Sequence, residues 1–285
     1  MRKKYRTPAA TACLAASGLL FGGCDMLDNA EGARSIFAAV QPPTPAELAE
    51  DMLQDYDPDA RATATVQLAN APFGGELPYI AAYVDGASDP DASVRSASIK
   101  ALSLHGQPEH ADILLAALRD EDAGVRLEAA RALQRIHNPD VVADLLTSLS
   151  EPDALAEEFV GEDDDRVRSA VAHALGQYAE PRVVQGLIAA LDDRALAVNE
   201  SSRESLVVLT GEDFGLDRAA WFGWFEFSTD PFAGRTEYNY PRFARDRTLI
   251  EFLPLVPQPP NEPRATPVGM DPRDLTGTPR DNDAG

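Results

Sequence analysis

The stretch VRSASIKAL fills residues 94–102, and the same pattern returns as VRLEAARAL at 125–133 and as VRSAVAHAL at 167–175. In each copy the apolar residues fall three and four positions apart, which places them on one side of a helix. A longer spacing recurs five times: an arginine-like position, a leucine seven residues later, and an apolar residue sixteen residues after that. The five sets are Arg61/Leu68/Val84, Arg95/Leu102/Leu118, Arg126/Leu133/Leu149, Arg168/Leu175/Leu191 and Asn199/Leu206/Phe222. Such constant spacing predicts a stack of repeated units instead of a single wound core.

Each unit has the pattern of two antiparallel helices. The second helix begins at a proline in three units, at Pro108, Pro139 and Pro181. Proline is tolerated at the first helical position because the amide it lacks would have no partner there. At the ends of the stack we expect two covering helices: one over residues 44–57, capped by Thr44 and begun by Pro45, and an aromatic one from Asp217 to about Phe227. Terminal units must cover the apolar ends of a stack.

An acidic residue stands six positions before each arginine-like position. These residues are Asp55, Asp89, Asp120, Glu162 and Asp193. We expect their carboxylates to cap the first helices of the units, where free amides and the positive helix end favour an anion. We also expect them to approach arginines of the same or neighbouring units and so form a ladder of ion pairs.

The acidic loop, the VR-x-x-A-x-x-AL helix and a second helix ending in AL-x-D resemble HEAT repeats of the bilin-lyase-like kind over roughly residues 55–227. The resemblance implies an all-α fold, a right-handed α-solenoid of about five HEAT-like helix pairs with disordered termini. It leaves the function open, because the family includes scaffolds, adaptors and a few enzymes. The arginine-like positions are 34, 31, 42 and 31 residues apart, and the 42 marks an insertion of about eleven residues after Leu149.

The N-terminus has the features of an export signal. Residues 1–23 combine a basic start, MRKKYR, with an apolar middle and two glycines before Cys24. The segment LLFGGC resembles the lipobox of bacterial lipoproteins, in which the cysteine after the cleavage site is lipidated; Phe21 departs from the usual leucine. Loss of Cys13 with the signal leaves Cys24 as the only cysteine, which excludes an internal disulfide. We therefore expect a lipid on Cys24 and localisation to a membrane of the bacterial cell envelope. A free or intermolecular thiol beside an ordinary cleavage site is the alternative.

These observations divide the chain into five expected segments: a lipoprotein signal peptide (1–23), a linker (24–43), the repeat solenoid (44–227), an aromatic and proline-rich capping extension that lies back over the final helix (228–256), and a disordered tail (257–285).

Charge and motifs narrow the chemistry. The net charge is −22, and removal of residues 1–23, which hold four basic and no acidic residues, leaves 21 basic against 47 acidic residues, or −26. Such a field disfavours nucleic-acid binding. We find no cysteine cluster, H-E-x-x-H, G-x-S-x-G or phosphate-binding glycine loop, and so expect no catalytic residues, no resident metal, no cofactor and no small-molecule substrate. Two weaker candidates for cations are the pair His105 and His110, and the acidic insertion with Glu157, Glu158, Glu162, Asp163, Asp164 and Asp165.

The remaining candidate is a surface. In a stack of helix pairs the second helices line the inner face, and counting from each proline identifies outward positions on it. The residues expected to bind a partner protein of unknown identity are Glu109, Asp112, Asp140, Arg182 and Gln185. The sequence thus favours a membrane-anchored, non-enzymatic scaffold for protein–protein interaction. The alternatives are a lyase-like or metal-dependent enzyme on the same scaffold, and a structural envelope spacer.

Overall fold

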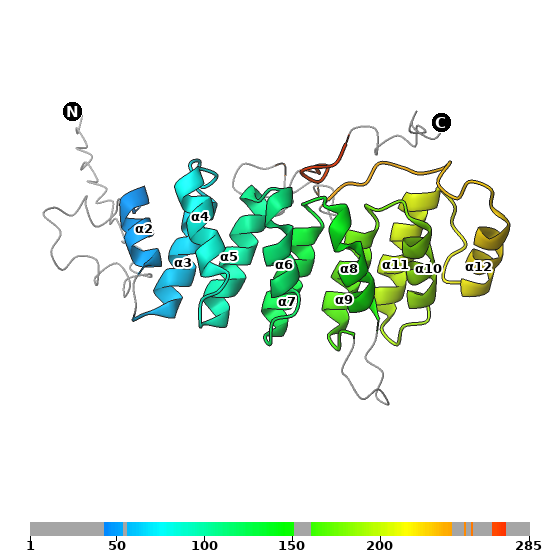
Figure 1. Ribbon diagram of the computed structural model, residues 1–285, viewed down its shortest axis with the longest axis horizontal. Helices are drawn as coiled ribbons and strands as arrows, with labels where there is room; N and C mark the ends of the chain where they lie inside the picture. Colours follow the sequence, from blue (N-terminus) through cyan, green and yellow to red (C-terminus); the bar gives the residue numbers. More distant parts are fainter. Residues whose placement is uncertain are drawn as a thin grey trace, which may run out of the picture. The chain divides into compact units, whose positions relative to one another are not determined.

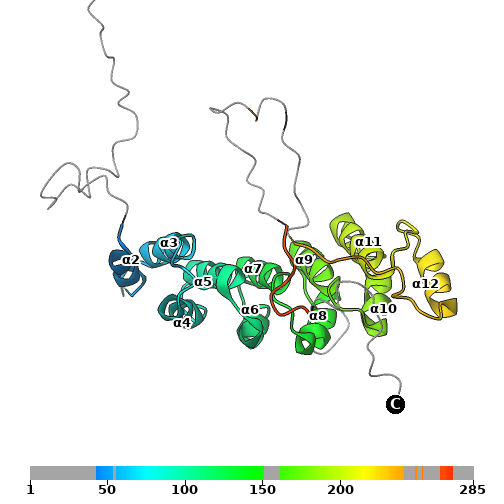
Figure 2. The same ribbon diagram turned by 90° about the horizontal axis from the view of Figure 1, so that it is seen from above.

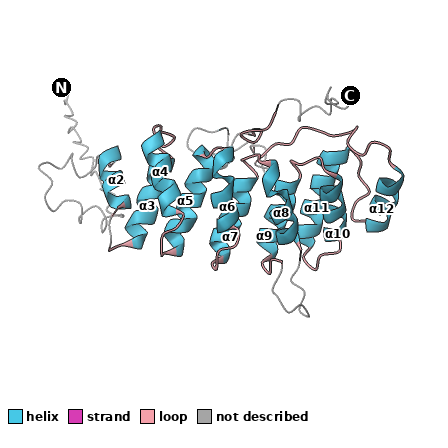
Figure 3. Ribbon diagram, viewed as in Figure 1, coloured by secondary structure: helices cyan, strands magenta, loops and turns pink. Residues whose placement is uncertain are grey.

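The computed structural model of the chain describes residues 43–53, 56–150, 161–240, 248, 252 and 264–271. The expected signal peptide, Cys24 and nearly all of the linker lie outside these residues. The chain divides into two units, Met1–Thr44 and Pro45–Gly285, and almost every described residue belongs to the second. Within the described ranges the second unit contains helices and loops, with two isolated β-bridges and no strand (Figure 3).

The helices follow one another as α2 (Pro45–Met52), α3 (Pro58–Ala69), α4 (Leu77–Gly86), α5 (Ala92–His105), α6 (Ala111–Ala117), α7 (Ala123–Leu133), α8 (Val142–Leu149), α9 (Asp165–Leu175), α10 (Pro181–Ala190), α11 (Leu196–Thr210) and α12 (Arg218–Phe227). Two short 3-10 turns, η2 (Pro108–His110) and η3 (Pro139–Val141), lead into α6 and α8. The all-α class and the solenoid are therefore confirmed.

The helices form two layers. The first layer contains α3, α5, α7, α9 and α11, each packed against the next, and the other contains α4, α6, α8 and α10, called here the second-helix layer (Figures 1 and 2). Each helix of the second-helix layer packs against the first helix of the following pair: α4 on α5, α6 on α7, α8 on α9 and α10 on α11. Consecutive pairs are thus joined through both layers, while α2 packs on α3 at the start of the stack.

The apolar stripe lies where the spacing placed it. The five leucines that follow the arginine-like positions are fully buried, and the leucines that close three of the second helices are 2–4% exposed: Leu68, Leu102, Leu133, Leu175 and Leu206, then Leu118, Leu149 and Leu191. In the first set the expected Val84 is only half-buried, and its neighbour Tyr83 is fully buried instead. Ala101, Ala132 and Ala174 are fully buried beside them, which lets neighbouring helices approach closely.

The last set is wrong by one residue, because Trp221 is fully buried whereas Phe222 is 57% exposed. Helix α12 has its own cap, Asp217, whose carboxylate accepts from the Ala220 amide 3.0 Å away, and its start departs from the proline-led register of the earlier units. The aromatic cover itself is present, with Phe214 set edge-on to Trp221.

Two of the three prolines begin a different structure from the one expected. Pro181 begins an α-helix, but Pro108 and Pro139 begin the 3-10 turns η2 and η3. In η2 the Gln107 amide donates to the ring Nδ1 of His110, 2.9 Å away, and holds a tighter first turn. Such tightening satisfies the amides that have no partner at a helix start.

The chain after α12 also departs from expectation. It runs along α11 and α9: the Thr236 amide donates to the Val208 carbonyl (2.9 Å), and Arg235 donates to the Gln177 carbonyl (2.8 Å). Residues 264–271, expected to be disordered, lie against the turn between α7 and η3. There the Val268 amide donates to Arg135 and the His137 amide donates to Val268, both at 2.8 Å (Figure 1, red). We call residues 264–271 the strap.

Candidate functional site

Four arginines of the first layer reach forward to the next repeat. Each uses Nε and Nη2 to bind both oxygens of one carboxylate at 2.7–3.1 Å, in the pairs Arg61–Asp89, Arg95–Asp120, Arg126–Glu162 and Arg168–Asp193. This two-point geometry is the strongest form of arginine–carboxylate pairing. The expected ladder is confirmed, and its register runs always from one unit to the following one.

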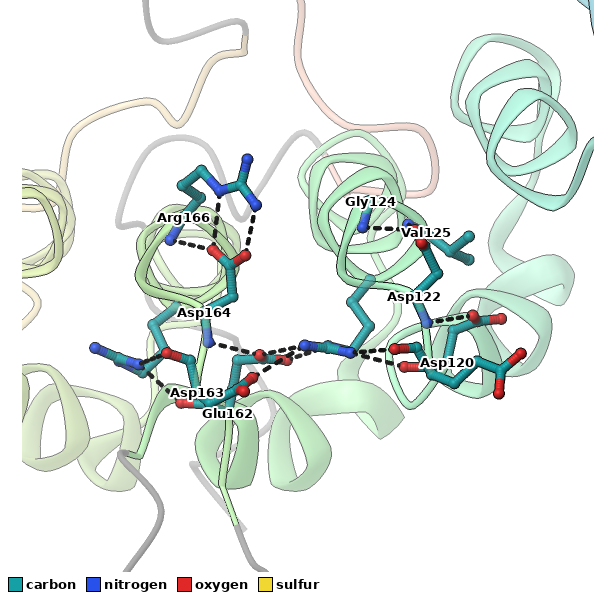
Figure 4. A network of polar contacts seen from close by, with 11 residues as sticks. Asp120, Asp122, Gly124, Val125, Glu162, Asp163, Asp164 and Arg166 are labelled. Atoms are coloured by element: carbon teal, nitrogen blue, oxygen red, sulfur yellow. Dashed lines mark hydrogen bonds and ion pairs between the residues drawn. The ribbon is translucent and has the colours of Figure 1, made fainter. Parts of the chain in front are cut away.

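The third arginine nitrogen binds the arginine's own repeat. Nη1 of Arg126 donates to the carbonyls of Asp120 and Glu121, at 2.9 and 3.1 Å, and Arg168 does the same with those of Glu162 and Asp163 (Figure 4). Arg95, Arg126 and Arg168 therefore each join two consecutive loops. In the last repeat Asn199 takes this position and donates to the Leu191 carbonyl at 2.7 Å, so that it binds back to the end of α10 instead of reaching forward.

The expected capping role of the ladder carboxylates is wrong. The first helices α3, α5, α7 and α9 are capped two residues later, by Asp57, Asp91, Asp122 and Asp164. Each ladder carboxylate instead accepts from the amide of the residue two positions on, as Asp120 does from Asp122 at 2.9 Å (Figure 4). The preceding arginine occupies the oxygens that a cap would use. Asp55 lies outside the described residues.

The ladder side chains are largely buried, which indicates that the ion pairs stabilise the fold. The side chains of Arg168 and Asp193 are each only 3% exposed. Although burial acts to raise the pKa of Asp120, the hydrogen bonds from Arg95 and from the Asp122 amide hold that pKa below its usual value. The bond to Asp120 likewise raises the pKa of Arg95. The ladder arginines and carboxylates stay charged, and their hydrogen-bonding atoms are already occupied. Such groups are poorly suited to act as acids or bases or to bind a metal ion.

The two candidate cation sites also have structural roles. In the insertion, Glu162 and Asp163 bind Arg126 and Asp164 caps α9, while Glu157 and Glu158 lie outside the described residues. The His105 ring Nε2 lies 2.7 Å from the Ala69 carbonyl, and His110 Nδ1 is held by Gln107. No group of three metal-ligating side chains occurs in the part of the chain that the structure describes.

The sequence did not reveal one cluster of a serine, a histidine and an acidic residue, because its members come from two helices in different repeats. Ser201 Oγ lies 3.0 Å from His173 Nε2, and His173 Nδ1 lies 3.9 Å from Glu204. The order serine, histidine, acid is that of hydrolase triads. Here, however, Ser201 is 4% exposed in the middle of α11 and donates to the Ala197 carbonyl at 2.7 Å. A hydroxyl held in this way is a poor nucleophile, and the cluster connects α9 to α11.

The residues predicted to bind a partner all lie exposed at the second-helix layer. Glu109 lies in η2, Asp112 in α6, Asp140 in η3, and Arg182 and Gln185 in α10. Of these side chains, Arg182 forms an ion pair with Glu180 at 2.5 Å. The five side chains therefore present polar groups at equivalent places in successive repeats. Among the described helices, none has both the length and the apolar character to cross a bilayer.

Comparison with known proteins agrees with this architecture. Residues 80–158 match the model of HEAT repeats, and residues 167–193 match that of the PBS lyase HEAT-like repeat. No curated protein matches the chain significantly.

Solved structures with similar folds include the complex of CpcE and CpcF of phycocyanin lyase from Nostoc sp. PCC7120, with 17% identity, 59% of this chain and 77% of that chain covered, and a TM-score of 0.39. Another is a computationally designed armadillo repeat protein for modular peptide recognition, with 14% identity, 62% and 86% covered, and a TM-score of 0.41. Residues 80–158 and 167–193 thus match models of HEAT repeats in sequence, and the helix pairs described within these ranges agree with that match.

Proposed function

We propose that the chain is a membrane-anchored, non-enzymatic scaffold that binds another protein through its second-helix layer. The observation that carries this proposal is a difference between the polar side chains of the two helix layers. The first layer holds its repeat arginines in the ladder, whereas the second-helix layer presents polar side chains that are exposed in register at Glu109, Asp112, Asp140, Arg182 and Gln185. Repeats stacked in this way form an extended surface suited to an elongated partner.

The anchor in this proposal is a lipid on Cys24, which lies outside the described residues. Its support is the sequence alone: a basic and apolar leader, two glycines, and then the cysteine. More than one acyl chain gives stable anchoring without a membrane-spanning segment. Labelling cells with an alkyne fatty acid tests this part, since a Cys24→Ala variant would lose the label and leave the membrane fraction.

The partner face is tested by crosslinking in native membranes. We expect wild-type protein to capture a defined protein, and the double variant Asp112→Arg/Asp140→Arg to lose it, because two charges of the exposed face are reversed. The matched control, Asp230→Arg/Glu226→Arg, changes the charge equally on the far end of the stack at α12 and the loop after it. Equal capture by both variants would contradict the proposal.

The match of residues 167–193 to the PBS lyase HEAT-like repeat motivates an enzymatic alternative. Elemental analysis and the visible absorbance spectrum of the purified protein distinguish the two: a stoichiometric metal or a bound pigment would favour the enzyme. A structural spacer, the third reading, predicts high abundance and no specific crosslinked partner.

A further inference from the structure

We propose that a groove at the start of the solenoid binds a short peptide segment of a partner protein, in which an apolar side chain stands next to a lysine or arginine. This inference goes beyond the proposed function, because the groove lies between α2 and α4, whereas the five residues of the proposed partner face belong to η2, α6, η3 and α10. It has a volume of about 520 Å³, and its apolar walls include Met52, Leu53, Leu68, Tyr79, Ala82 and Val94. That volume falls in the range of ordinary ligand sites.

The groove carries one carboxylate that the protein does not use. Asp85 lines it, and among the described residues no ion pair or hydrogen bond to its carboxylate is formed. The other charged residues of the lining, Arg61 and Asp89, neutralise one another at 3.0 Å and belong to the ladder. The groove therefore has an unbalanced negative charge, which a cationic group next to the apolar walls would satisfy.

A second polar group lies deep in the lining. The hydroxyl of Ser98 is buried and has no hydrogen-bond partner in the described structure. Gly86 lies opposite, and a Cβ there would come within 2.3 Å of this hydroxyl. Buried polar atoms are nearly always hydrogen-bonded, so an exception within a groove suggests a partner that arrives with a ligand.

The surrounding charge favours a basic partner. Residues 44–99 contain ten acidic residues and two basic ones, Arg61 and Arg95, and both arginines are held in the ladder. Opposite charges steer association and select partners.

Large apolar side chains in the lining and close to it in sequence are exposed. Leu53 is 78% exposed, Tyr56 94% and Leu77 82%. A run of exposed apolar residues next to a groove is typical of a protein-binding surface. These exposed apolar side chains favour a peptide with apolar residues over a compact small molecule.

The test uses the full-length chain and a fluorescein-labelled eight-residue peptide of alternating leucine and lysine, with binding followed by fluorescence anisotropy. A peptide of alternating leucine and glutamate is the charge control. We expect the lysine peptide to bind and the glutamate peptide to fail. Asp85→Asn should weaken binding about fivefold, whereas Glu226→Gln, the same charge change on exposed α12, should leave it unchanged.

A second variant fills the space instead of changing the charge. Ala82→Leu should weaken binding more than tenfold by occupying the groove, with a thermal melt by circular dichroism to check that the fold is retained. If that variant does not fold, the affinity of Asp85→Asn for the lysine peptide alone tests the proposal. Equal affinities for Asp85→Asn and Glu226→Gln, or equal binding of the two peptides, would overturn the proposal. Self-association that Ala82→Leu abolishes would assign the groove to a second copy of the chain and overturn it too. Neither outcome bears on capture by the second-helix layer, which is read separately by crosslinking.

Discussion

At the scale of single residues, the ladder arginine holds two loops together through its side-chain hydrogen bonds. Arg168 contacts the carboxylate of one loop and two carbonyls of another, and is almost completely buried while doing so. Its pairing could be foreseen from sequence, because arginines and acids recur at fixed offsets. The direction of pairing and the caps two residues further on could not, since both depend on how far one unit is displaced from the next.

Removal of one ladder arginine should be costly. We expect Arg168→Ala to lower the free energy of unfolding by about 3–5 kcal/mol, because the buried carboxylate of Asp193 is left without its partner. Arg182→Ala, which breaks an exposed pair with Glu180, should cost under about 1 kcal/mol. Urea denaturation followed by circular dichroism measures both, and similar losses in the two variants would refute the structural role of the ladder.

The cap of α9 should make stability depend on pH in the acid range. The hydrogen bond from Arg166 lowers the pKa of Asp164 to about 2, from 3.8. A carboxyl whose pKa is lowered by folding stabilises the protein above its unfolded pKa, and that contribution disappears as the pH falls from about 4 to about 2. Solvent screens the exposed Arg166, so we expect about 1 kcal/mol.

Asp164→Asn keeps an acceptor for the cap but removes the titration. The difference in unfolding free energy between wild type and this variant should therefore shrink between pH 5 and pH 2. A difference that stays constant over this range would show that Asp164 does not carry the effect.

At the scale of elements, the sequence predicts helices well and the connections poorly. Helices α5, α7 and α9 follow directly from the three copies that begin with VR and end with AL, because their periodicity reflects burial on one side. The strap has no comparable pattern. It is held by backbone hydrogen bonds to a turn more than 120 residues earlier, and such bonds leave no signature in side-chain composition. The groove between α2 and α4 depends likewise on the placement of whole helices.

The strap should detach when Gly269 gains a side chain. Its φ is +89°, a conformation that favours glycine, and a Cβ would lie 2.4 Å from Pro108 Cγ. We expect Gly269→Ala to accelerate hydrogen exchange at the amides of His137 and Val268, with protection of the α5 and α7 amides unchanged. Arg264→Ala, an exposed position of the strap, is the control. Unaltered exchange in Gly269→Ala would mean that the strap tolerates the side chain.

At the scale of the whole molecule, the described part of the second unit is a series in which each helix pair is joined to the next by packing and by one arginine. The apolar contacts supply most of the stability, while the arginines fix the register between loops, and Asn199 ends the ladder with a bond back to the end of α10. The second-helix layer takes no part in the ladder, which leaves it available to a partner.

The most direct test of this account is a pair of double-mutant cycles on Arg95. The structure joins this arginine to the carboxylate of Asp120 in the next repeat, but to Asp89 of its own repeat only through the backbone carbonyl. Urea denaturation of the alanine variants and their doubles should give a coupling of about 1–3 kcal/mol for Arg95 with Asp120 and close to zero for Arg95 with Asp89. Equal couplings, or a larger one with Asp89, would contradict a solenoid joined by arginines that reach forward from each repeat to the next.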